Sequence, residues 1–328
     1  MLLLASGTAA LELASQHLLR CVLRNSQSNE DIILLPLLRS IAAQGGTFVE
    51  LGAFDGREGS QSWLLEKCFG WKGVLIEASP QNFALLNQTE RNPHTRKVHS
   101  AVCDADNDKP GEVNVLGGGA TVAGVEKDMP SVFKRHWHKA HEDCGGMPCL
   151  SKVPCRSLPS IMANAGYPRV NFLSLDVEGG EETVLLTTGK TMDTFQFDVV
   201  MVEADRNDRA KNHRVANLLT KMGMKALYIP QSQGSTNELY VRPNIIDVRP
   251  NATSLKPLLD AAFALANHTR LMHAIKQHDT SRYLHYIHNR TGGNTVIQRL
   301  IAGMHDEVDA FLTDNSEERV AKLAAILQ

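Results

Sequence analysis

Apolar runs alternate with helical stretches along the chain between residues 47 and 242. Seven short runs are rich in β-branched or apolar side chains, at residues 47–51, 73–77, 97–102, 170–176, 198–203, 225–229 and 238–241. Residues 60–69 and 80–87 have helical spacing, and Ser79-Pro80 is typical of a helix cap followed by a first-turn proline. This alternation is typical of βαβ units and predicts an α/β fold with a mostly parallel sheet.

Two parts of the chain do not follow this rhythm. Residues 104–159 contain three successive glycines and a histidine-rich patch, which predicts an insertion or lid that selects the substrate. After residue 242 the strand signals stop, and apolar residues recur at helical spacing in 255–275, 295–304 and 317–327. We therefore divide the chain into an N-terminal helical segment (1–24), an α/β domain (25–245, with the insertion) and a helical C-terminal extension (246–328).

The composition excludes several classes of protein. The chain has 328 residues, of which 43% are apolar, enough for one or two continuous cores and too many for a disordered chain. Its 34 Lys and Arg against 36 Asp and Glu give a net charge of −2, so charge provides no reason to expect nucleic acid as a partner. No apolar run approaches the roughly 18 to 20 residues of a membrane-spanning helix. The function must therefore be sought in local sites, and the oligomeric state is not indicated.

The sequence gives mixed signals about the cellular compartment. Sequons at Asn87, Asn251, Asn267 and Asn289 favour a secretory route. The apolar N-terminus lacks a basic flank, contains Glu12 and continues as an amphipathic helix, which argues against a signal peptide. We expect a cytoplasmic protein, with the secretory lumen as the alternative.

A group of histidines and cysteines lies in the insertion. It consists of His136, His138, His141, Cys144, Cys149 and Cys155. Their spacing matches no standard zinc site, so we favour a solvated loop with one disulfide over a metal centre.

Glycine and acidic residues follow the predicted strands. The first strand leads into a turn that contains Gly52 and Gly56, a spacing that disfavours the G-x-G-x-x-G turn of dinucleotide enzymes. The second strand ends at Glu77, where a carboxylate suits the ribose hydroxyls of an adenosine-type ligand. The fourth strand ends in Asp176-Val177-Glu178-Gly179-Gly180-Glu181, and the fifth is followed by Glu203 and Asp205. Because the carboxyl ends of parallel strands share one edge of a sheet, we expect one acidic cleft.

Three motifs in this order resemble the FkbM family of S-adenosylmethionine-dependent methyltransferases. They are Phe48-Val49-Glu50-Leu51-Gly52-Ala53-Phe54-Asp55-Gly56, Gly70-Trp71-Lys72-Gly73-Val74-Leu75-Ile76-Glu77-Ala78-Ser79-Pro80, and the acidic segment from Asp176 to Glu181. The resemblance spans roughly residues 25–242. It implies a class I methyltransferase, Rossmann-like fold, with a seven-stranded mostly parallel sheet, the last strand antiparallel, and helices on both faces. It also implies S-adenosyl-L-methionine as cofactor and transfer of its methyl group to a hydroxyl of a small molecule or sugar.

The resemblance assigns roles to particular residues. Glu50, Gly52 and Asp55, with Gly56 beside them, would line the methionine moiety, and Glu77 would accept the ribose hydroxyls. Ala78, Ser79, Cys103 and Asp104 would lie near the adenine. Asp176 would lie beside the sulfonium methyl group, next to an acceptor pocket that Glu178 adjoins, and we expect Asp176 and Glu178 to be the catalytic pair. One of these carboxylates, partly desolvated, could act as the base that a weakly acidic hydroxyl needs.

Three alternatives compete with this hypothesis. Asp176, Glu203 and Asp205 could hold a divalent cation, as hard oxygen ligands do for Mg²⁺, but we do not expect a metal. The same sheet could serve an NAD(P)-dependent oxidoreductase, which the glycine spacing disfavours. The domain could also be a catalytically silent interaction module, which the intact acidic residues disfavour.

Overall fold

The computed structural model describes residues 26, 30–42, 45–104, 111–137, 149–167, 169–189, 196–204, 208–227 and 236–243. The predicted N-terminal segment and C-terminal extension lie outside these residues. The elements are α2 (Glu30–Ile41), β1 (Thr47–Leu51), α3 (Trp63–Phe69), β2 (Lys72–Glu77), α4 (Pro80–Gln88), β3 (Arg96–His99), β4 (Ala101–Val102), β5 (Gly111–Leu116), β6 (Gly124–Val125), α5 (Ser131–Trp137), β7 (Leu150–Arg156), α6 (Leu158–Ala165), β8 (Arg169–Leu175), α7 (Glu181–Gly189), β9 (Gln196–Glu203), α8 (Arg209–Lys221), β10 (Lys225–Leu227) and β11 (Asn237–Val241).

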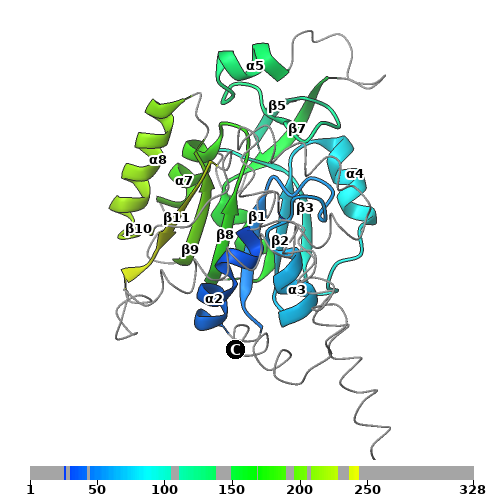
Figure 1. Cartoon of the computed structure of the whole chain (residues 1–328). Coiled ribbons are helices and arrows are strands. Elements are labelled where there is room, and N and C mark those ends of the chain that lie inside the picture. Colours follow the sequence, from blue (N-terminus) through cyan, green and yellow to red (C-terminus); the bar gives the residue numbers. More distant parts are fainter. Residues whose placement is uncertain are drawn as a thin grey trace, which may run out of the picture. The chain divides into compact units, whose positions relative to one another are not determined.

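The main sheet has seven strands in the order β10-β11-β9-β8-β1-β2-β3 (Figure 1). β3, β2, β1, β8 and β9 run parallel to one another, and β11 is antiparallel to both β9 and β10. The protein is therefore α/β with a mixed sheet, and all seven predicted strand regions contribute to it. The carboxyl ends of β1, β2, β8 and β9 lie together at one edge.

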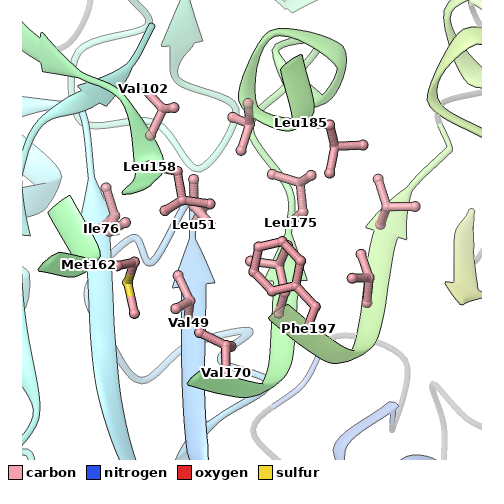
Figure 2. Packing of buried hydrophobic residues seen from close by; sticks show 14 of the residues in the cluster. Val49, Leu51, Ile76, Val102, Leu158, Met162, Val170, Leu175, Leu185 and Phe197 are labelled. Carbon is pink, nitrogen blue, oxygen red and sulfur yellow. The ribbon is translucent and has the colours of Figure 1, made fainter. Parts of the chain in front are cut away.

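Helices cover both faces of this sheet. On one face Val49, Leu51 and Val200 pack with residues of α6, α7 and α8 in one apolar cluster. Figure 2 shows part of it, with Leu158 and Met162 of α6 close to the strands. Strand residues that point the other way are also buried, and Phe48 is an example. On that face α2 contacts α3 and β8, and α4 contacts β2 and β3.

Local sequence explains where helices begin. Ser79 caps α4, its side chain accepts a hydrogen bond from the Asn82 amide, and Pro80 occupies the first turn, as the sequence predicts. α6 begins in the same way, with Ser157 as the cap and Pro159 in its first turn. These caps satisfy amide groups that the helices leave unpaired. Trp71, which precedes β2, is fully buried in the core.

The described part of the insertion is folded, whereas residues 138–148, in which we expected a solvated loop, lie outside the described residues. Its strands β5, β6 and β7 join β4, which directly precedes the insertion, in a second sheet of order β4-β7-β5-β6, and β5 pairs with β7 over six residues. The predicted strand at 97–102 is split, because β3 belongs to the main sheet and β4 to this second sheet. Short-range patterns predict strands but not their sheet, which depends on pairing over tens of residues. In Figure 1, β5 and β7 lie beyond the carboxyl ends of the parallel strands.

A disulfide joins the beginning and the end of the insertion. Cys103 follows β4 and bonds to Cys155 in β7, with a sequence separation of 52. The partner of Cys155 is thus Cys103, which lies outside the histidine and cysteine group in which we expected one disulfide. Cys68 and Cys149 are also disulfide-bonded, and none of the described cysteines carries a free thiol. Cys144, His138 and His141 lie outside the described residues.

Removing the Cys103–Cys155 disulfide should destabilise the protein without abolishing the main sheet. Closing a loop of this length restricts the unfolded chain, so we expect Cys103→Ser with Cys155→Ser to lower the free energy of unfolding by about 2 to 4 kcal/mol. Thermal unfolding of the wild type and the double variant, each with and without reductant, measures the effect. Equal melting temperatures of the two proteins without reductant would contradict the prediction.

Candidate active site

A cleft lies where the main sheet meets the insertion. The main sheet contributes Leu51, Gly52, Ile76 and Glu77 to its walls, and the insertion contributes Gly124, Val125 and Asp128. Further lining comes from Ala78, Ser100, Ala101, Val102, Ala123, Val177, Gly180 and Val184. The cleft is therefore at the carboxyl edge of the parallel strands, where we expected it.

Gly52 allows two strand ends to approach closely. Its backbone has φ of +74°, and a Cβ atom at this position would lie 1.8 Å from the backbone oxygen of Asp176. The Gly52 amide donates to the Ile76 oxygen at 3.1 Å, which joins the turn to the end of β2 as well. A side chain here would separate the turn after β1 from the end of β8.

Gly52→Ala is expected to lower the free energy of unfolding by about 2 to 5 kcal/mol, because it combines a backbone clash with a left-handed conformation. Gly59→Ala is a matched control, because Gly59 has a similar φ of +72° but a Cβ atom added there would meet no other atom within 4 Å. Chemical denaturation should show a loss of about 1 to 2 kcal/mol for the control. If Gly52→Ala were no less stable than Gly59→Ala, the close approach would have no energetic importance.

The Glu77 carboxylate is held by backbone amides on the cleft wall. One oxygen accepts from the Phe54 amide at 2.8 Å and the other from the Ser79 amide at 2.7 Å. Burial raises the pKa of Glu77 to about 7, and hydrogen bonds from Ser79 and Phe54 oppose this effect. Hydrogen bonds with the Ala78 amide and the Asn82 side chain lower the pKa of Glu77 further. The carboxylate is thus anchored by protein donors on the cleft wall, where a ligand hydroxyl could share its oxygens.

Glu50 has a different environment from Glu77. Its side chain is 4% exposed and accepts hydrogen bonds from Ser60 Oγ and the Gln61 amide, each at 2.8 Å, and from the Ser62 hydroxyl. Arg91 is also buried and donates to the Gly56 oxygen and to Ser62 Oγ, so it stabilises the same loop between β1 and α3. Glu50 therefore holds the loop that follows β1, and its predicted contact with a methionine moiety stays a prediction.

Asp55 and Gly56 also shape this loop. Asp55 Oδ1 accepts from the amides of Arg57 and Glu58 at 2.7 and 2.8 Å. Gly56 has φ of +75°, and a side chain there would collide with Leu86 of α4. Both residues thus have clear structural functions at a turn beside the cleft.

The four residues predicted near the adenine separate into two groups. Ala78 lines the cleft directly, and Ser79, next to it, is fully buried and donates its hydroxyl hydrogen to the Gly118 oxygen in the insertion. Cys103 is engaged in the disulfide and packs in the core of the second sheet, while Asp104 is exposed. The neighbouring Ala101 and Val102 line the cleft instead.

Asp176 and Glu203 form a carboxyl pair at the ends of β8 and β9. They are joined by a hydrogen bond, and burial together with neighbouring charges raises the pKa of both groups. The negative charge of Asp176 is the largest cause for Glu203, so Glu203 holds the proton at neutral pH and donates it to Asp176. Burial is the largest cause for Asp176 and raises its pKa to about 6. Asp176 as a whole residue is exposed, and its neighbours Val177 and Gly180, but not Asp176 itself, line the cleft.

Glu178 and Glu181 flank the carboxyl pair differently. Glu178 has φ of +57°, an uncommon conformation for a non-glycine residue, and contributes to the raised pKa of Glu203. Glu181 is fully buried, accepts from the amides of Val177 and Gly179 at 3.1 Å, and pairs with the buried Lys211. Glu181 therefore stabilises the backbone of the segment from Asp176 to Glu181, whereas Glu178 lies in a turn of this segment and has a strained backbone conformation. The sequence did not indicate that Lys211 is buried, because its position in a helix pattern is the same as that of a surface lysine.

The described residues contain no group of three or more His, Cys, Asp or Glu side chains arranged to hold a metal ion. Asp205, one of the three metal candidates, lies outside the described part of the chain. Asp176 and Glu203 are occupied with each other through the shared proton.

The insertion supplies site residues that the sequence did not indicate. A side chain at Gly124 would lie 3.0 Å from the Val177 oxygen, and one at Gly179 would lie 2.7 Å from the Asp128 oxygen. β6 and the turn that follows it are thus in close contact with the segment from Asp176 to Glu181. Asp128 is set among ordinary loop residues, so only folding places it in the cleft.

A parallel strand edge with a glycine turn and acidic strand ends defines an α/β protein built to bind a nucleoside-type ligand. The chain belongs to the methyltransferase FkbM domain family, whose model matches residues 50–226, more than half of its length. The predicted resemblance is confirmed. Membership implies a methyltransferase that uses S-adenosylmethionine. Comparison with curated protein sequences gave no significant match.

Several solved methyltransferase structures are distantly similar. An O-methyltransferase from Bacillus cereus in complex with SAH is 12% identical, with 71% of this chain and 91% of that chain covered and a TM-score of 0.35. A methyltransferase from Pyrococcus furiosus is 12% identical, with coverage of 64% and 82% and a TM-score of 0.33. Precorrin-6y C5,15-methyltransferase from Geobacter metallireducens GS-15 is 10% identical, with coverage of 63% and 86% and a TM-score of 0.33. Similarities this weak support no inference about activity.

In the described part of the chain, no helix has both the length and the apolar character needed to cross a bilayer.

Proposed function

We propose that the protein transfers a methyl group from S-adenosylmethionine to a hydroxyl oxygen of a small molecule or sugar. The observation that carries the proposal is the placement of Glu77 and Asp176 at one strand edge, the first on the cleft wall at the end of β2 and the second exposed directly after β8. Glu77 would bind the ribose hydroxyls. Apolar residues beside it, such as Ala101 and Val102, suit a flat base.

The residues present fit such a ligand. The cleft joins an anionic acceptor, apolar walls and a buried Asp128 oxygen that lacks a hydrogen-bond partner in the described structure. When bound, S-adenosylmethionine supplies an activated methyl group on a sulfonium. Family membership favours this ligand over the NAD(P) alternative.

Asp176 is suited to act as the general base. A pKa of about 6 leaves it ionised at neutral pH but still able to accept a proton, and Glu203 orients it through the shared hydrogen bond. During the transfer Asp176 would take the proton that the acceptor hydroxyl loses. Glu178, at the adjacent turn, would contact the acceptor.

Calorimetric titration of the purified protein with S-adenosylhomocysteine tests the cofactor, and a panel of sugars and hydroxylated small molecules with labelled donor tests the transfer. We expect saturable binding and labelling of at least one hydroxyl compound. Absence of binding would contradict the proposal, and tight binding of NADH in its place would favour the oxidoreductase.

We also propose that the protein functions in an oxidising compartment. All four described cysteines are disulfide-bonded, and structural disulfides are rare in the cytosol. The four sequons agree with a secretory route. These observations favour the secretory lumen over the cytoplasm that the N-terminal sequence suggested, and glycosidase-sensitive migration of the protein expressed in eukaryotic cells would test this.

A further inference from the structure

The start of α4 is joined to the part of the insertion that contains the three successive glycines, residues 117–120. The Ser79 hydroxyl donates to the Gly118 oxygen, and Asn82 Nδ2 donates to the Ala120 oxygen at 3.0 Å. Both donor residues are buried, and Asn82 is only 2% exposed. Because α4 begins shortly after β2 ends, these hydrogen bonds join the insertion to the strand end that forms the candidate ribose site.

Asn82 also has a hydrogen bond with Glu77. A side-chain amide carries two hydrogens, so the single NH2 group can serve the Glu77 carboxylate and the Ala120 oxygen together. The other end of the amide, Asn82 Oδ1, is inaccessible to solvent and has no hydrogen-bond partner in the described structure. Unsatisfied buried acceptors are uncommon because they cost free energy. The orientation of this side chain is therefore determined by its two donors.

We propose that Asn82 is a positioning residue, which holds the Glu77 carboxylate in place for the ribose and joins it to the insertion. This inference rests on the proposed use of S-adenosylmethionine, in which Glu77 binds the ribose hydroxyls. A donor stabilises the ionised form of a carboxyl group, so Asn82 lowers the pKa of Glu77 and opposes the effect of burial. Asn82 thereby keeps more of the Glu77 carboxylate ionised, and able to accept from the ribose, at neutral pH.

The immediate surroundings of Glu77 are largely uncharged. α4 contains no charged residue, and neither does the glycine-rich part of the insertion. The titratable groups on the neighbouring elements are Asp55 in the loop after β1, His99 on β3 and Asp128 in the insertion. The largest causes of the shift in the pKa of Glu77 are nevertheless burial and hydrogen bonds, and one of these hydrogen bonds comes from Asn82.

Calorimetric titration with S-adenosylhomocysteine at several pH values tests the inference on the wild type, Asn82→Ala and Asn82→Leu. Loss of one hydrogen bond to the carboxylate should move the midpoint of the rise in affinity from about pH 7 to about pH 8. The affinity of both variants should then be about fivefold below that of the wild type at pH 7, and within about twofold of it at pH 8.5. Asn82→Leu nearly keeps the volume of the side chain, so it removes the donors without leaving a cavity.

Two controls separate this function from packing. Asn87→Ala removes an exposed asparagine from the same helix and should bind like the wild type at every pH. Ser79→Ala removes the other hydrogen bond to the insertion but keeps the backbone amide that donates to Glu77. Any loss of affinity in Ser79→Ala should therefore be the same at every pH. Circular dichroism and melting temperature would establish that each variant is folded.

The wild type provides a test that needs no substitution at Asn82. The side-chain amide resonances of Asn82 should titrate together with Glu77, with a midpoint of about 7, and should not do so in Glu77→Gln. An unchanged midpoint of binding in both Asn82 variants, or a loss of affinity that is equal at every pH, would overturn the inference and leave the proposed function intact. Failure of the wild type to bind S-adenosylhomocysteine would overturn both.

Discussion

Glu77→Ala should weaken binding of S-adenosylhomocysteine by about 100-fold. The change removes the carboxylate that would accept from the two ribose hydroxyls, and each hydrogen bond to a charged acceptor is worth about 1.5 kcal/mol or more. It also leaves the amides of Phe54 and Ser79 without the partners that shape the turn. Calorimetric titration measures the loss, and the exposed Glu90→Gln should bind like the wild type.

The pH dependence of the free energy of unfolding of Glu77→Gln shows whether a loss of binding in this variant is caused by a loss of folding. Because burial raises the pKa of Glu77 from 4.5 to about 7, the folded protein binds this proton more tightly than the unfolded chain. The resulting stability is fully present below pH 4.5 and is lost as the pH rises through about 7. Glu77→Gln should therefore lack this component of the pH dependence and remain folded at about pH 8.

Binding should change with pH in the opposite sense. Ribose hydroxyls donate best to the ionised carboxylate, so wild-type affinity for S-adenosylhomocysteine should rise as the pH passes through about 7. Glu77→Gln should show no such rise. An equal rise in both proteins would assign the titration to another group.

Asp176→Asn should lower kcat for methyl transfer by about 100- to 10,000-fold, the usual contribution of a general base. The amide keeps the size of the side chain but cannot accept the hydroxyl proton. We expect KM for the acceptor to change far less than kcat, measured with labelled donor on a hydroxyl compound that the wild type methylates. A loss confined to KM would make Asp176 a binding residue.

Glu203→Gln is the matched control for this prediction. Glu203 is protonated at neutral pH and donates to Asp176, and a glutamine amide can donate in the same place. The variant should keep kcat within a few fold. In the wild type, activity should fall as the pH drops through about 6, where Asp176 takes up its proton.

The site shows how far strand-end motifs can be interpreted without a structure. Glu77 and Asp176 each follow a run of apolar residues, and parallel strands bring such positions to one edge regardless of the distance in sequence. Gly52 was recognisable for the same reason. The structural role of Glu50 was not recognisable from the sequence. Its carboxylate accepts hydrogen bonds from Ser60 and Ser62, and the strand pattern does not predict that the loop containing these serines folds back onto Glu50.

The sequence by itself determined the α/β class, the seven strand regions of the main sheet and the helix start at Ser79-Pro80, because these depend on side-chain periodicity and local capping. Tertiary structure alone decided the second sheet, the Cys103–Cys155 pairing, the burial of Lys211 against Glu181 and the placement of Asp128 in the cleft. The disulfide and the Lys211–Glu181 pair join residues 52 and 30 positions apart, and the β5–β7 pairing and the position of Asp128 depend on segments that are also distant in sequence. Such contacts form only when whole elements pack, and no local pattern encodes them.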